Sequence, residues 1–179
     1  MRVRLLQLTL VGVIGLLHIA EGANLGDVVI SELMWMGDFS GATHEWLELN
    51  NRTDELIDLS GWELTRLSGG EENLMLTIPE GVIPPHGYFL LSNNSAADSN
   101  LAVEPDLVNT AVSLANSQLQ IKLYDWQFGS GGKLIDVADD GVGAPAAGDN
   151  VAKKSMTRVE PPGDGTRPEQ WITASTRSG

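Results

Sequence analysis

Four carboxylates that could act as a general acid and base lie in or beside apolar runs in the early part of the chain: Glu32, Glu45, Glu48 and Asp58. Catalysis by a carboxylate pair needs two such groups at a defined separation. Glu45 and Glu48 are three positions apart, so they face opposite sides of a regular strand. We interpret Glu48, which shares the parity of Trp46, as part of the outer face. Glu45, at the start of the strand, is placed to cap a loop or bond backbone amides. The pattern therefore favours a structural framework over catalysis.

A histidine base is the second chemical possibility. Beyond residue 22 the chain has two histidines, His44 and His86, and it has no cysteine, which excludes thiol catalysis and zinc–thiolate sites. HExxH, GxSxG and Walker motifs are absent from the sequence. Because a triad can converge from distant positions, an extracellular hydrolase, or an accessory domain of one, is the alternative function. His44 and Glu45 are its adjacent base and acid.

Calcium binding is the third possibility, because several aspartates lie in glycine-rich loops: Asp38, Asp139, Asp140, Asp149 and Asp164. Calcium prefers such flexible oxygen ligands. The chain has no DxDxDG-type loop, however, and loop aspartates commonly bond their own turns. We therefore expect no cofactor. Asp139, Asp140, Asp149 and Asp164 are the calcium candidates of a further alternative, a calcium-dependent adhesion module.

The five tryptophans divide into two groups. Trp62 and Trp171 are predicted to fill the core, whereas Trp35, Trp46 and Trp126 lie at predicted strand ends or outer faces. Exposed aromatic rings could stack on sugars or anchor a protein partner. The alternative, which we favour, is that they pack under the 36–44 loop and the 94–111 connection. The residues we assign to binding are Trp35, Trp46, Asp38 and Asp140, and on this reading Trp46→Ala leaves folding mostly intact.

Short apolar runs separated by Gly, Pro, Asn and Asp predict an all-β fold that positions these residues. The expected strands are 28–35, 45–50, 62–67, 74–79, 88–93, 119–125, 133–139, 155–160 and 171–175. GGEEN, residues 69–73, is expected to turn the chain between two of them. About eight or nine strands without an amphipathic helix or internal repeat predict one antiparallel sandwich or barrel.

The N-terminus predicts export. A basic start, an apolar run over 5–19 and the small residues Ala20 and Gly22 are typical of a secretory signal peptide, residues 1–22. The alternative is an uncleaved anchor, but the run is shorter than the ~20 residues of a spanning helix. Cleavage removes two basic and one acidic residue, so the net charge goes from −13 to −14. Such a charge argues against nucleic acid and anionic lipid as partners, and without disulfides the core alone must hold residues 23–179 together.

Several motifs occur in an order that resembles the lamin tail domain family in its bacterial exported form. They are VVISELMW, EWLELNN, DLSGWELT, LTIPEGVIPPHGYFLLS, the LANSQLQIKLYD and GKLIDVAD hairpin, and SMTRVEPPGDGTRPEQW, which together span residues 28–171. The resemblance implies an immunoglobulin-like antiparallel β-sandwich with a core of about 28–173. It also implies an appendage of exported proteins, sometimes beside hydrolases, that serves in attachment. The chain has no coiled-coil rod, so filament assembly and chromatin binding are not implied.

These observations together predict a non-catalytic exported module with an immunoglobulin-like fold. It would tether to a protein or glycan at the cell surface through loops at the end of the sandwich or through an open edge strand. The expected location is extracellular, at the cell surface or periplasmic. No nucleic acid is expected as a partner, and no membrane contact is expected after signal cleavage.

Overall fold

The computed structural model describes residues 22–175, and each of the nine strand regions expected from the sequence contains a strand. The all-β prediction is confirmed. Two-residue strands bring the number in the described chain to twelve, because runs such as 57–58 are too short to show a period of two. The predicted signal peptide lies almost wholly outside the described residues. Within residues 22–175, none of the helices is long and apolar enough to cross a membrane.

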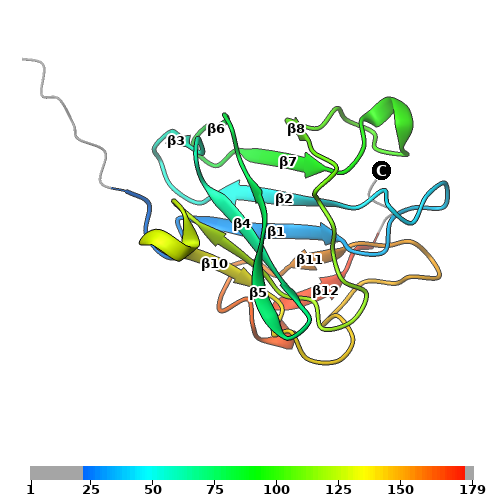
Figure 1. The fold of residues 1–179 in the computed structure, drawn as a ribbon. Helices are drawn as coiled ribbons and strands as arrows, with labels where there is room; N and C mark the ends of the chain where they lie inside the picture. The colour runs from blue at the N-terminus through cyan, green and yellow to red at the C-terminus, as the bar shows by residue number, and fades with distance from the viewer. Residues whose placement is uncertain (1–21, 176–179) are drawn as a thin grey trace, which may run out of the picture.

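The larger sheet has six strands (Figure 1). Their order is β12 (Trp171–Thr173), β11 (Met156–Arg158), β1 (Val28–Met34), β2 (Trp46–Asn51), β7 (Tyr88–Ser92) and β8 (Leu107–Val108). Neighbours are antiparallel except for β7 and β8, which run parallel. A register shift between Ile30 and Glu32 places a bulge in β1, in the middle of the sheet.

The smaller sheet has the order β10 (Leu134–Ala138), β9 (Ile121–Tyr124), β4 (Glu63–Ser68) and β5 (Glu71–Thr77). In Figure 1, β4 and β5 cross in front of β1 and β2, so the two sheets form the layers of a sandwich. A separate ribbon joins β3 (Ile57–Asp58) to β6 (Val82–Ile83). Three single-turn helices lie in connections: η1 (Ala96–Asp98), η2 (Phe128–Ser130) and η3 (Pro168–Gln170).

The turn between β4 and β5 is shorter than the sequence suggested. Gly69 and Gly70, with φ of 65° and 82°, make a two-residue hairpin, and β5 already begins at Glu71. Two consecutive residues with positive φ match the right-handed twist of the flanking strands. Residues 71–73, predicted as turn, therefore belong to the strand.

The core lies between the two sheets. Leu47, Leu49, Ile121 and Leu123 are fully buried, as their alternation predicted. The buried apolar side chains of the described chain form one cluster to which both sheets contribute. At ~25 cal/mol per Å² of apolar surface, this burial is the main favourable term in a chain without disulfides.

Candidate functional site

A carboxylate pair does form on the larger sheet, but its members are Glu32 and Glu48. The bulge in β1 brings these residues opposite each other across the β1–β2 pair. Ser31 Oγ donates to Glu48 Oε1 at 2.6 Å, and Ser155 Oγ donates to Glu32 Oε1. Burial raises the pKa of Glu48, and the nearby Glu32 adds to this rise. Each carboxylate is thus bonded to a serine of the framework, and neither lines the cleft described below.

Glu45 bonds a backbone amide, as expected. Only 8% of this residue is exposed, and its Oε2 accepts the N–H of Leu114 at 3.0 Å. Burial raises the pKa of Glu45 to about 7, although the Leu114 N–H and the charge of Arg66 oppose the rise. Arg66 Nη1 donates to the carbonyl of Ser113 at 3.3 Å. The Glu45 carboxylate and the Arg66 guanidinium therefore hold two adjacent residues of one connection, Leu114 and Ser113.

His44 belongs to a network that closes its own loop. Asp38 Oδ1 and Ser40 Oγ lie 2.9 and 3.0 Å from the same ring atom, His44 Nδ1. A Ser–His–Asp triad needs the serine and the acid on different ring nitrogens, so this geometry does not form one. Burial opposes ionisation of Asp38, but hydrogen bonds from Ser40, His44 and Asn100 outweigh it and hold the pKa well below its usual range. Asp38 thus ties the 36–44 loop to the 94–111 connection.

Trp35 and Trp46 are packed under loops, the interpretation favoured over exposed rings. They are 7% and 6% exposed, because loops cover the face to which they point. Trp35 Nε1 donates to the carbonyl of Ala147 at 2.9 Å. Trp46 lies beside Asp38 and Asn100, under the two segments named as its alternative cover. Trp126 is 53% exposed, whereas Trp62 and Trp171 are buried as predicted. A binding role for Trp35 and Trp46 stays a prediction, now without exposed rings to support it.

The loop aspartates do not come together in one metal-binding group within residues 22–175. Asp139 accepts the N–H groups of Asp140 and Ala146, and Asp140 accepts that of Val142. Asp149 and Asp164 likewise bond residues two or three positions onward in their own loops. In residues 22–175, groups of three or more metal-binding side chains are absent. Calcium binding by these residues stays an untested prediction.

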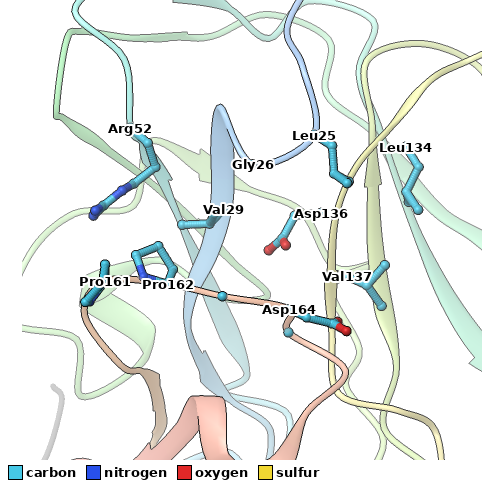
Figure 2. Close-up of a pocket in the computed structure, with 12 residues that line it drawn as sticks. Leu25, Gly26, Val29, Arg52, Leu134, Asp136, Val137, Pro161, Pro162 and Asp164 are labelled. Carbon is cyan, nitrogen blue, oxygen red and sulfur yellow. The ribbon is translucent and has the colours of Figure 1, made fainter.

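A further candidate site is a cleft that the sequence did not reveal. Figure 2 shows it between β1, the end of β2, β10 and the 161–165 loop, and its volume is about 640 Å³. Most of its walls are aliphatic side chains, prolines and glycine backbone. The lining residues are Leu25, Gly26, Val29, Arg52, Leu134, Asp136, Val137, Pro161, Pro162, Gly163, Asp164 and Gly165.

Asp136, which lines the cleft, belongs to a buried ion pair. The β1–β11 pairing begins at Glu32, so Ile30 has no strand partner on that side. Asp136 Oδ2 accepts the Ile30 N–H at 2.8 Å, and Arg158 Nη1 donates to the Ile30 carbonyl at 3.4 Å. Arg158 also bonds both Asp136 oxygens, at 3.1 and 3.2 Å, and lies 4.9 Å from the ring centre of Trp171. Burial raises the pKa of Asp136, while Arg158 and the Ile30 N–H favour its charged form. Two side chains thus replace a missing stretch of strand and join the two sheets.

The rim of the cleft carries charges that are also paired. Arg52 Nη1 donates to Glu160 Oε1 at 2.8 Å, and Asp164 lies 3.9 Å from Arg167. The charged groups in and around the cleft therefore cancel, and the cleft is close to neutral although the chain has a net charge of −13.

Glycines bring the cleft walls close to the edge of β10. Gly26 N–H donates to the Ile135 carbonyl, and Asp139 N–H donates to the Gly165 carbonyl, both at 2.9 Å. A Cβ atom on Gly165 would lie 1.9 Å from the Val137 oxygen, so this approach requires glycine. The outer edge of β10 is thereby covered at both ends of the cleft and does not offer a free ladder for strand addition.

One sequence signal pointed to this site. Asp136, the partner of Arg158, is a charged residue within an otherwise apolar strand, and such residues are rarely buried unless paired. Their separation of 22 positions and their location on different sheets concealed the pairing.

A comparison with protein-family models gives one match, to the model described as Lamin Tail Domain, over residues 21–141, about two thirds of the chain. A search of curated proteins finds no match. The 161–165 wall of the cleft and Arg158 lie beyond the matched segment.

Proposed function

This chain belongs to the lamin tail domain family, whose members share a non-catalytic immunoglobulin-like domain, and we propose that it is an exported binding module. The family membership confirms the immunoglobulin-like sandwich predicted from the sequence. Export is proposed from the basic start and the apolar N-terminal segment, which are typical of a signal peptide. The module would attach to a component of the cell surface.

The cleft is the observation that carries this proposal. Its volume of about 640 Å³ and mostly apolar walls are typical of sites that bind ligands through shape and hydrophobic burial, with few polar contacts. The cleft lies at the side of a sandwich whose sheets are joined beneath it by Asp136 and Arg158. A rigid link of this kind lowers the entropy cost of binding, because the site does not need to order itself around its partner.

The lining favours a protein partner over a glycan. Sugar sites usually stack the sugar on an aromatic ring, and none of the residues that line the cleft is aromatic. Trp126, the exposed tryptophan of the described chain, is not among them. Aliphatic and proline side chains are better suited to the apolar side chains of a protein.

The contacts of the acidic residues weigh against the hydrolase alternative. Glu45, Glu48 and Asp136 each accept hydrogen bonds from the framework, and His44 Nδ1 is shared between Asp38 and Ser40. A base committed in this way is poorly placed to take a proton from a substrate. Nuclease, phosphatase and glycosidase assays of the purified protein test this directly, and activity that disappears in Glu45→Gln would establish the alternative.

Binding to isolated cell envelopes tests the attachment function. Leu25 lines the cleft and is 71% exposed, so Leu25→Asp places a charge in the cleft without opening the core. Val142→Asp is the matched control, because Val142 is 73% exposed and lies outside the cleft. We expect envelope binding to fall about tenfold in Leu25→Asp and to stay unchanged in Val142→Asp, since burying an unpaired charge is costly. Binding that is equal in Leu25→Asp and the unmodified protein would refute a role for the cleft.

Treatment of the envelopes separates the two partner classes. Protease digestion should abolish binding if the partner is a protein, whereas enzymatic removal of glycans should not change it. The opposite result would transfer the proposal to a glycan.

A further inference from the structure

Resting on the attachment function proposed above, we infer that the cleft receives a short segment of a partner protein whose entering side chains are aliphatic and uncharged. The inference concerns the chemistry of the occupant. It follows from the pairing of the charges around the cleft, the shape of its walls and the hydrogen-bond donors that remain free at its rim.

The paired charges exclude a charged side chain as the occupant. Asp136 has both oxygens bonded by Arg158, whose side chain is 2% exposed. At the rim, Arg52 is held by Glu160 at 2.8 Å. A lysine or carboxylate entering the cleft would lose its water without finding an unpaired opposite charge, which is strongly unfavourable. An aliphatic side chain has no such cost and gains ~25 cal/mol for each Å² that it buries.

The walls of the cleft enclose the occupant from two sides. They are the side chains of β10 on one side and the prolines of the 161–165 loop on the other, as Figure 2 shows. A volume of about 640 Å³ lies within the range of roughly 300–1,000 Å³ typical of ligand sites. Because Gly26 and Gly165 cover the edge of β10, the segment would lie across the walls and not extend the sheet.

Arg52 supplies the polar contact that orients the segment. The hydrogen bonds of its side chain within the described residues, to Asn50 Oδ1 and Glu160 Oε1, both start from Nη1. The Nε and Nη2 groups are left to donate to a backbone carbonyl of the occupant. A guanidinium held in place by a partner on one nitrogen is well suited to such a contact, because little further entropy is lost.

Blocked synthetic peptides of defined chemistry test the inference. The probe is acetylated and amidated Gly-Ser-Val-Ile-Val-Ser-Gly, and its controls replace the central Ile by Lys, Glu or Ser. Binding is followed by amide shifts in NMR spectra of the full protein. We expect the aliphatic peptide to shift amides of Val29, Val137 and Gly163. Affinity should fall about tenfold for the Lys and Glu peptides, since each would bury an unpaired charge.

Protein variants locate the contact. Leu25→Asp should lower the affinity for the aliphatic peptide about tenfold, and Val142→Asp should leave this affinity unchanged. Arg52→Lys keeps a cation beside Glu160 but removes the free guanidinium donors, so we expect a loss of about threefold, the scale of one hydrogen bond. Shifts centred elsewhere, or equal affinity for the Lys and Ile peptides, would overturn the inference.

The outcome also separates this inference from the function on which it rests. Loss of envelope binding in Leu25→Asp together with no binding of the aliphatic peptide would refute the aliphatic occupant and retain attachment through the cleft. Unchanged envelope binding in Leu25→Asp would refute the attachment function itself, whatever the peptides do.

Discussion

Removing Asp136 should cost more stability than removing any exposed carboxylate, because it leaves the buried Arg158 guanidinium without an opposite charge. Asp136→Ala deletes the acceptor of the Ile30 N–H and both contacts to Arg158, whose side chain is 2% exposed. Breaking a buried pair costs ~3–5 kcal/mol, and an orphaned buried N–H costs ~1–3 kcal/mol. The two terms overlap, so we expect a loss of about 4–6 kcal/mol from a stability typical of ~5–15 kcal/mol.

Substitution of Arg158 should cost less stability than substitution of Asp136. Arg158→Met leaves Asp136 without its cation, but burial raises the pKa of Asp136, so this carboxyl can take up a proton and become neutral. The guanidinium of Arg158 cannot lose its proton in the same way, so in Asp136→Ala it stays charged. We therefore expect Arg158→Met to cost about 2–4 kcal/mol. The double variant Asp136→Leu with Arg158→Met should stay within about 2 kcal/mol of the unmodified protein, because replacing a buried pair with apolar groups is often close to neutral.

Urea unfolding followed by tryptophan fluorescence measures these free energies, with an unchanged m-value as the check on two-state behaviour. Asp54→Ala is the control, because Asp54 Oδ1 lies 2.8 Å from His86 Nε2 and the Asp54 side chain is 93% exposed. Its loss should cost less than about 1 kcal/mol. A cost below about 1.5 kcal/mol for Asp136→Ala, or single effects that simply add in the double variant, would refute the reasoning.

Three further predictions concern individual side chains. Trp46→Ala should lower the free energy of unfolding by about 3–5 kcal/mol, in contrast to the expectation from sequence, because the ring is 6% exposed; a loss below about 1 kcal/mol in urea unfolding would contradict this. Glu45 titrates near 4.5 in the unfolded chain and near 7 in the fold, so the folded state binds the extra proton and stability should fall by about 1–3 kcal/mol as pH rises from 4.5 to 8. Glu45→Gln keeps the acceptor for Leu114 and should abolish that part of the slope, and a slope equal to that of the unmodified protein would exclude Glu45 as its source. Added calcium should leave the melting temperature unchanged, because the loop aspartates bond their own turns; a rise at millimolar calcium would restore the calcium alternative.

Much of the framework could be predicted from the sequence. Alternation in 119–125 and 45–50 identified Ile121, Leu123, Leu47 and Leu49 as core residues, and all four are fully buried. Side chains of consecutive strand residues point to opposite faces, so the pattern of burial is a local property that neighbouring letters carry. The order of the motifs was enough to identify the family.

The candidate site was not predictable in the same way. Parity placed Trp46 on one face of its strand and left two alternatives for that face, an exposed ring or cover by the 94–111 connection; the contact with residues 99–101 decided between them. A bulge of one residue in β1, invisible in the alternation, set Glu32 opposite Glu48 in place of the pair considered from spacing.

The cleft shows the same division most clearly. Its walls come from four segments separated by up to about 140 positions, and its lining residue Asp136 of one sheet pairs with Arg158 of the other. By itself the sequence determined the nine main strand regions and the apolar alternation within them, because both depend on near neighbours along the chain. Which loop covers a face, and which buried charges meet, was decided only by the tertiary structure, since these contacts join residues whose separation in sequence carries no periodic signal.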